Sequence, residues 1–143
     1  DGNEIKSDEL FSGNTVTVVN FWFTTCSPCV SELSELDELN KELSGKGGSL
    51  IGINSFTLDG DEAAISEAKA VLKKKDASYR NVYFDSDSEA GKFVENVYAY
   101  PTTYVVDRSG SIVGEPIVGA VTGKSQMEKL KSLIDQCIDA DMK

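Results

Sequence analysis

The sequence predicts an α/β fold with a mixed central sheet flanked by helices. Two observations predict this class. Early in the chain, strand-like segments alternate with an amphipathic helical segment, which requires parallel strands joined by a crossover helix. Later, two strand-like segments are separated only by a short turn, which predicts an antiparallel hairpin. We expect one domain over residues 1–143.

The first predicted unit is a strand, a helix and a second strand. Residues 15–21 are rich in β-branched side chains and predict a buried strand, and residues 50–54 predict its neighbour. The helix between them begins at Cys26, with Pro28 in the first turn, where a missing N–H does no harm. The expected apolar face of this helix consists of Val30, Leu33, Leu36, Leu39 and Leu43.

The other predicted elements follow from the same periodicities. They are a helix over 61–75, a short strand over 82–84, a helix that residues 85–87 cap and that runs to about 94, a hairpin of 102–106 and 111–115, and a helix over 124–140.

Composition excludes several classes of function. The formal net charge of −10 argues against a nucleic-acid partner, because phosphate binding depends on Lys and Arg. The chain has no His, which excludes Ser-His-Asp hydrolysis and His-ligated metals, and its three Cys cannot complete a four-ligand zinc site. No apolar run is long enough to predict a membrane span.

Cys26, Ser27, Pro28 and Cys29 form a CxxC motif at the predicted helix start, which is suited to redox chemistry. Only a thiolate attacks a disulfide, and the unpaired N–H groups of a first helical turn favour a negative sulfur. Cys26 lies nearer the N-terminus of the helix and is predicted to be the nucleophile. Cys29 is predicted to be the resolving thiol. This chemistry needs no cofactor beyond the two cysteines.

Two alternatives use the same thiols. A soft-metal (copper) chaperone could hold its ion between them, but a second ligand pair is missing, since only Cys137 and carboxylates remain. A thiol peroxidase commonly has a Thr one turn before the reactive Cys and an Arg beside it. Thr24 and Thr25 are too close to Cys26, and the first Arg of the chain is Arg80.

Residues 19–32 (VNFWFTTCSPCVSE) and 100–113 (YPTTYVVDRSGSIV) resemble the TlpA/ResA-like branch of the thioredoxin superfamily. The resemblance covers nearly the whole chain and implies a thioredoxin fold with an inserted helix-plus-strand segment at about 57–86. It implies a monomeric reductase of protein thiols and disulfides, with cytochrome c maturation components and a membrane thiol-reducing protein as partners. It also implies an extracytoplasmic location, through an N-terminal export or anchor segment absent from this chain.

The resemblance assigns further site residues. Pro101 falls on the cis-proline that faces the CxxC, so the backbone of Tyr100 is expected to pair with an extended substrate segment. Ser27 and Pro28 are expected to set the redox properties and substrate contacts. Trp22 is expected to pack beside the redox pair, mainly as a core residue.

The resemblance also predicts that a buried acid is missing. Thioredoxins carry Asp where this chain has Asn20, and ResA-like proteins carry a Glu where it reads 55–57 (SFT). Glu32 is expected to be solvated, and Asp59 or water is left to deprotonate Cys29. The helix lacks the Pro that often follows Glu32, so we expect it to be straight. Cys137 is expected to be a buried, inert thiol.

Overall fold

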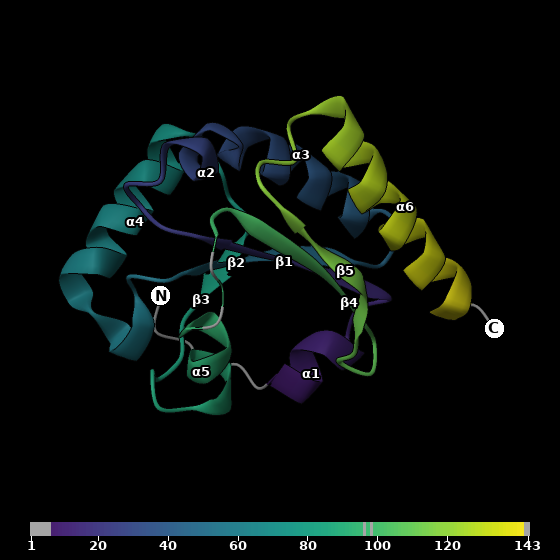
Figure 1. Ribbon diagram of the computed structural model, residues 1–143, viewed down its shortest axis with the longest axis horizontal. Helices are drawn as coiled ribbons and strands as arrows, with labels where there is room; N and C mark the ends of the chain where they lie inside the picture. Colours follow the sequence, from purple (N-terminus) through teal and green to yellow (C-terminus); the bar gives the residue numbers. More distant parts are fainter. Residues whose placement is uncertain (1–6, 96, 98, 142–143) are drawn as a thin grey trace.

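A computed structural model describes residues 7–95, 97 and 99–141. Its five-stranded sheet has the order β3-β2-β1-β4-β5, with helices on both faces (Figure 1). The strands are β1 Val16–Trp22, β2 Ser49–Asn54, β3 Arg80–Val82, β4 Thr102–Asp107 and β5 Ile112–Val118. The helices are α1 Ser7–Ser12, α2 Ser27–Ser31, α3 Leu33–Ser44, α4 Glu62–Lys74, α5 Glu89–Glu95 and α6 Lys124–Asp141, with a 3-10 turn, η1, at Leu58–Gly60.

The sheet is mixed, as predicted. β1 pairs in parallel with β2 and antiparallel with β4, while β2–β3 is parallel and β4–β5 antiparallel. Every residue of the central strand β1 is buried, which agrees with its run of β-branched and aromatic side chains. β1 is the central strand and ends at Trp22, so the motif that follows it is attached to a fully buried strand.

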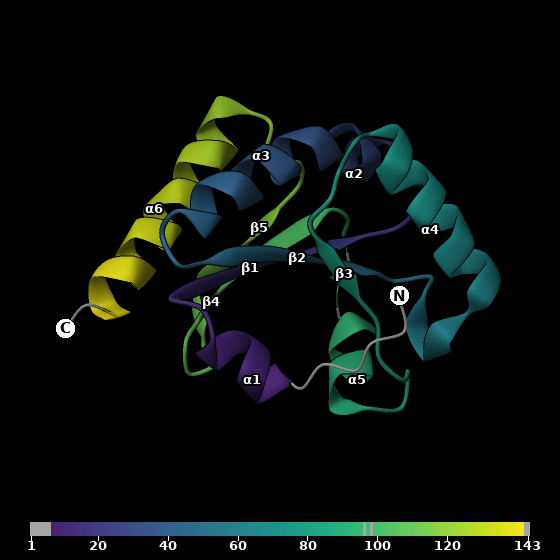
Figure 2. The same ribbon diagram turned by 180° about the vertical axis from the view of Figure 1, so that it is seen from behind.

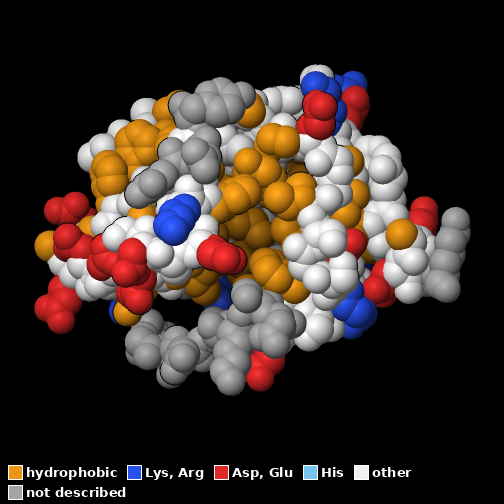
Figure 3. Space-filling view, turned by 60° about the horizontal axis from the view of Figure 1, so that its bottom comes forward, with side chains coloured by type: hydrophobic (Ala, Val, Ile, Leu, Met, Phe, Trp, Pro, Cys, Tyr) orange, Lys and Arg blue, Asp and Glu red, His pale blue; other side chains and the backbone are white. Residues whose placement is uncertain are grey.

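Alternate residues of β1 face two separate apolar cores. Figures 1 and 2 show α3 and α6 side by side on one face of the sheet, and α1 and α5 on the other. The first core contains Val18, Trp22 and both motif cysteines beneath the helices α2, α3 and α6. The second contains Val19 and Phe21. Figure 3 shows the side of α1 and α5, where hydrophobic side chains gather in a hollow bordered by acidic ones.

Some element boundaries differ from the sequence prediction. β3 was expected over 82–84 but covers Arg80–Val82. The chain leaves the sheet after Val82 because Phe84 O accepts the N–H of Asp59 at 3.1 Å, in the turn before α4. α5 begins at Glu89, and Ser88 Oγ accepts the N–H of Gly91 at 3.0 Å, so the side-chain cap comes from Ser88 and not from 85–87.

Two further differences concern helices. α1 was not predicted, because six residues are too few to display a helical period. The helix expected to run straight from Cys26 is divided at Glu32 into α2 and α3. Among the described residues, no helix has both the length and the apolar character needed to cross a membrane.

Candidate active site

The two motif cysteines lie at the junction of β1 and α2 and are joined by a disulfide. Their Cα atoms are 5.2 Å apart. Cys26 is the N-cap of α2: its Sγ accepts the backbone N–H of Cys29 at 3.3 Å, and its own N–H donates to Phe23 O at 3.1 Å. An N–H group aimed at Sγ favours a thiolate there once the disulfide is reduced. The predicted pairing of Cys26 with Cys29 is therefore present.

The disulfide is covered unevenly. Cys26 is 5% exposed and Cys29 is not exposed at all, while Ser27 and Pro28 between them are exposed. An attacking substrate can therefore reach Cys26 more easily than Cys29, which matches the expected order of the two thiols. Cys137 is free and buried in α6, and burial raises the pKa of its thiol, as suits an inert core residue.

Pro101 lies at the start of β4, directly after a cis peptide bond with Tyr100. Pro101 is buried, and its carbonyl accepts the N–H of Gly119 at 2.8 Å, which ties the start of β4 to the end of β5. Tyr100 is half-buried and packs against both cores.

Three aromatic rings form a continuous platform, named here by its members Phe23, Phe56 and Tyr100. The Phe23 ring centroid is 5.1 Å from that of Phe56 and 5.2 Å from that of Tyr100. Phe56 is 47% exposed, so the platform has a face open to solvent. Phe23 lies three residues before Cys26, and Tyr100 directly precedes Pro101. The platform therefore belongs to the same site.

Asn54, at the end of β2, positions the outer ring of this platform. Its Nδ2 donates to Thr24 Oγ1 at 3.0 Å, and its Oδ1 accepts the N–H of Phe56 at 2.8 Å. The N–H of Ser55 also donates to the carbonyl of Trp22 at 2.9 Å. These bonds hold the loop after β2 against the loop that carries the cysteines.

Trp22 lies in the same buried cluster as both cysteines and is 0% exposed. Its Nε1 donates to Asn81 Oδ1 of β3 at 2.9 Å. A side chain with no exposed surface supports the motif from below and has no surface on which a substrate could lie.

Glu32 corrects the prediction that the site lacks a buried acid. Its side chain, expected in solvent, is 0% exposed. Asn20 Nδ2 donates to Glu32 Oε1 at 3.1 Å, and the backbone N–H of Val121 donates to Oε2 at 2.8 Å. The carboxyl group is therefore supplied by the helix, one turn after Cys29, and not by β1.

The environment of Glu32 changes its acidity. Burial raises its pKa to about 7, although the hydrogen bonds from Val121 and Asn20 oppose the rise. A carboxyl with such a pKa exchanges a proton near neutrality, as a general base requires. Asp59 has the opposite properties: it is exposed, and the Ser86 N–H that its Oδ1 accepts lowers its pKa. Asp59 is therefore an exposed residue of the turn η1 and lacks the raised pKa of a base that works near neutrality.

One sequence signal could have located Glu32. It stands three residues after Cys29 and four before Leu36, both of which are buried on the core side of the helix. The break between α2 and α3 falls at the same residue, whose N–H donates to the carbonyl of Cys29, three residues earlier, at 3.3 Å.

In the described part of the chain, no group of three or more Cys, Asp or Glu side chains converges. The two arginines lie elsewhere in the fold. Arg108 pairs with Asp141 at 2.9 Å, and Arg80 stands in the edge strand β3. Neither supplies the Arg that a peroxidatic cysteine commonly has beside it.

A thioredoxin-type sheet with a disulfide at the N-terminus of its first crossover helix defines a thiol–disulfide oxidoreductase. The sequence comparisons agree. The AhpC/TSA family model matches residues 1–114. ResA, the thiol-disulfide oxidoreductase of Bacillus thuringiensis subsp. konkukian, is 32% identical over 133 residues, 93% of this chain and 70% of that protein. The chain belongs to the AhpC/TSA family and, within the thioredoxin superfamily, to its TlpA/ResA-like thiol–disulfide oxidoreductases.

Other relatives and solved structures extend this likeness. The thioredoxin-like protein YneN of Bacillus subtilis is 27% identical over 113 residues, 79% of this chain, which spans 62% of that protein's length. A thiol-disulfide oxidoreductase from Bacteroides fragilis has a TM-score of 0.63 at 25% identity, covering 89% of this chain and 86% of its own. StoA from Bacillus subtilis shares the fold, with a TM-score of 0.62 at 20% identity, covering 85% and 83%.

Proposed function

We propose that this protein is a dithiol reductase of disulfides in other proteins, and that Glu32 is the base that activates Cys29. The observation that carries the proposal is the order of groups from the surface inward. Cys26 is the more exposed cysteine and lies in the site that holds the aromatic platform, and the carboxyl of Glu32, three residues after Cys29, is buried.

The proposed reaction has two displacements. The Cys26 thiolate attacks one sulfur of a substrate disulfide, which forms a mixed disulfide and releases the other substrate sulfur as a thiolate. Cys29 then gives its proton to the ionised Glu32 and attacks Cys26 Sγ. The Cys26–Cys29 disulfide forms, and the second substrate sulfur leaves. The substrate gains the two electrons that the cysteine pair loses, so the dithiol itself serves as the redox group and no other cofactor is required.

The proposed substrate is an extended segment of a protein. Its backbone would lie beside Tyr100 and Pro101, in the manner of an added strand. Its apolar side chains would rest on the platform of Phe23, Phe56 and Tyr100, whose outer ring is 47% exposed. Ser27 and Pro28 are exposed between the cysteines and would contact the same segment.

We also propose a cellular setting. The similarity to ResA and to the thiol:disulfide interchange protein DsbE of Allochromatium vinosum, 28% identical over 134 residues, supports an extracytoplasmic monomer. Its substrates would include cytochrome c maturation components. A membrane thiol-reducing protein would restore the dithiol. The net charge of −10 supports the absence of a nucleic-acid partner.

The test is capture of the mixed disulfide. A Cys29→Ser variant should accumulate a covalent adduct through Cys26 with a peptide that carries a disulfide, whereas Cys26→Ser should not. Cys137→Ser is the matched control and should behave as wild type, since that thiol is buried. Mass spectrometry of the adduct identifies the bonded cysteine. Trapping at Cys29 in the Cys26→Ser variant, with none at Cys26, would reverse the roles. Consumption of peroxide without disulfide exchange would support the peroxidase alternative.

A further inference from the structure

Two buried polar atoms near Glu32 have no hydrogen-bonding partner among the described residues: Asn20 Oδ1 and Tyr79 Oη. Asn20 is 0% exposed and Tyr79 is 4% exposed. Buried side-chain oxygens in folded proteins almost always find a partner, and internal water is the usual one when protein groups are out of reach. Two such atoms beside an ionisable side chain therefore indicate a site for water.

The sheet register brings these side chains toward each other. Asn20 of β1 pairs with Gly52 of β2, which pairs with Asn81 of β3. Neighbouring strands lie about 4.8 Å apart, so the Cα atoms of Asn20 and Asn81 are roughly 10 Å apart. Tyr79 precedes Asn81 by two residues and belongs to the same core cluster as Cys29. Its long side chain can span most of the remaining distance.

The Tyr79 phenol is electrostatically coupled to Glu32. Burial raises the pKa of Tyr79, and the negative charge of Glu32 raises it further, ahead of the contribution of Asp37. This order holds although Asp37 Oδ1 accepts the N–H of Tyr79 itself at 3.1 Å. The charge of Glu32 therefore acts on the Tyr79 phenol within the core.

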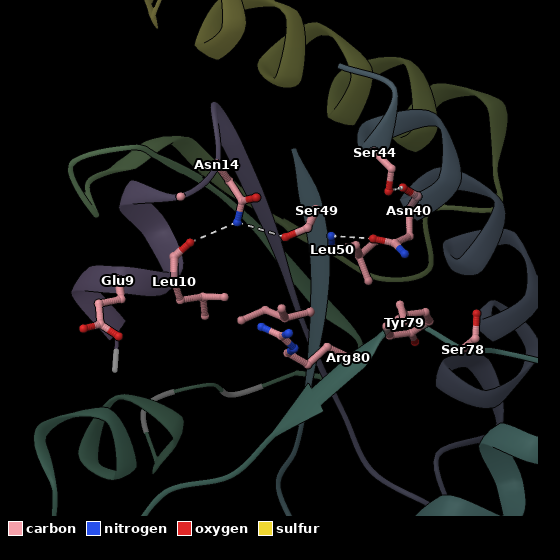
Figure 4. Close-up of a pocket in the computed structure, with 12 residues that line it drawn as sticks. Glu9, Leu10, Asn14, Asn40, Ser44, Ser49, Leu50, Ser78, Tyr79 and Arg80 are labelled. Carbon is pink, nitrogen blue, oxygen red and sulfur yellow. Dashed lines mark hydrogen bonds between the residues drawn. The ribbon is translucent and has the colours of Figure 1, made fainter. Parts of the chain in front are cut away.

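A cavity adjoins Tyr79. Figure 4 shows Tyr79 at the side of a cavity of about 400 Å³, together with Ser78, Asn40 and Ser44. The cavity lies toward the start of β2, away from the disulfide, which follows the other end of the parallel strand β1. Tyr79 thus borders a space large enough for several water molecules.

We propose that a water molecule bound between Tyr79 Oη and Asn20 Oδ1 makes Tyr79 a positioning residue for Glu32. The hydrogen bonds would run from Tyr79 Oη–H to the water, from the water to Asn20 Oδ1, and from Asn20 Nδ2 to Glu32 Oε1. Only the last of these bonds joins two protein groups, at 3.1 Å. The inference rests on the proposed role of Glu32 as the base for Cys29.

Such a chain has two effects. It fixes the amide of Asn20 with Nδ2 toward the carboxyl, because Oδ1 is occupied on the other side. Each hydrogen bond of the chain also strengthens the next one, so the bond from Asn20 to the carboxylate becomes stronger. A stronger bond to the carboxylate favours the ionised form of Glu32. The other groups around Glu32 do not replace Tyr79. Cys26 and Cys29 belong to the reaction, Glu35 opposes ionisation, Thr103 Oγ1 shares the same Asn20 amide, and Val121 N–H already occupies Oε2.

The experiment is a Tyr79→Phe substitution, which removes the phenolic oxygen and keeps the ring. The readouts are the pKa of Glu32, from carbon-13 NMR of its carboxyl, and the pH profile of mixed-disulfide resolution. We expect both midpoints to rise by about 0.3 units or more, roughly a twofold change in the ratio of ionised to protonated carboxyl at a fixed pH. Tyr83→Phe is the matched control, because that side chain is 47% exposed, and should move neither midpoint.

Two further measurements separate this role from a packing role. In a Glu32→Gln background, Tyr79→Phe should leave the pH profile of resolution unchanged. A high-resolution structure of the wild-type protein should contain a water within hydrogen-bonding distance of both atoms, a result that does not depend on the variant folding. A dry gap there, or unchanged midpoints in Tyr79→Phe, overturns the inference. If wild type exchanges disulfides normally while this happens, the proposed function stands and only the role of Tyr79 fails.

Discussion

Asn20 Nδ2 lies 3.1 Å from Glu32 Oε1, between a residue of the central strand and one of the helix that carries the cysteines. Asn20 stands where thioredoxins carry an acid. Here it donates a hydrogen bond to an acid, Glu32, that lies twelve residues later in the chain. The amide donates and cannot take up the proton, whereas the carboxyl can. In the proposed mechanism, the two residues together therefore do what one acid does in thioredoxins.

Glu32→Gln should slow the resolving step of the reaction. In wild type, resolution should become faster as pH rises through about 7, because Glu32 must be ionised to accept the proton of Cys29. The glutamine variant should lose this inflection, and its rate near pH 7 should fall by about 10²-fold or more. Stopped-flow decay of a preformed mixed disulfide gives both results. Decay with the wild-type profile in Glu32→Gln would show that another base serves Cys29.

The stability of the oxidised protein should fall as pH rises through neutrality. Glu32 has a folded pKa of about 7 against 4.5 in the unfolded chain, so between these values the folded state binds more protons. The contribution of Glu32 is then fully present below pH 4.5 and declines up to about pH 7. We expect a loss of about 2–3 kcal/mol over this interval.

Glu32→Gln is the control for that decline, since glutamine has no charge to bury. Asn20 can turn its amide to accept from the new side-chain N–H group. The variant should therefore match or exceed wild type in free energy of unfolding at pH 8, and the difference should shrink toward pH 4.5. Urea titrations at several pH values measure it. Parallel pH curves for the two proteins would contradict the prediction.

Trp22 should report the redox state. It is the single Trp of the chain and lies in one buried cluster with Cys26 and Cys29. A disulfide near an indole quenches its emission, so reduction by dithiothreitol should change the fluorescence of wild type. The double variant Cys26→Ser/Cys29→Ser should show no such response. An unresponsive wild type would place the ring too far from the disulfide.

Phe56→Ala should weaken substrate binding without disturbing the chemistry. The ring is 47% exposed and packs on Phe23, so its removal shortens the platform. We expect KM for a disulfide peptide with apolar residues beside its cysteine to rise about threefold to tenfold, with kcat nearly unchanged, from the loss of about 1 kcal/mol of apolar contact. The KM of Phe56→Leu should lie between those of wild type and Phe56→Ala. An equal loss with a purely polar peptide would argue against the platform.

Gly52→Ala should destabilise the fold through Asn81. A Cβ on Gly52 would come 2.3 Å from Asn81 Oδ1, the atom that accepts the Trp22 indole N–H. The expected loss is about 1–3 kcal/mol, from overpacking and the displaced hydrogen bond. Asn81→Ala in the same chain removes the clash, so the double variant should be less destabilised than the sum of the single variants. Strict additivity would show that the strain lies elsewhere.

The parts of this fold that could be predicted are those whose signals are local. The strand of 15–21, the cysteine pair and the closing helix each depend on the residue types in one short segment. Glu32 could not be placed so easily, because its burial depends on Asn20 in the neighbouring strand and on a backbone N–H at Val121. The end of β3 depends in the same way on a distant group, since Phe84 O accepts the N–H of Asp59 in the turn before α4.

The bond from Val121 to Glu32 has a consequence for the carboxyl end of the chain. Val121 stands in the short loop that enters α6, and its N–H donates to Glu32 Oε2 at 2.8 Å. If Glu32 takes up the proton of Cys29 as proposed, its negative charge is lost, and this hydrogen bond should weaken. The amide hydrogen of Val121 should thus exchange with deuterium faster when Glu32 is protonated than when it is ionised. The exchange rate at the start of the last helix would then report the protonation state of Glu32 during the reaction.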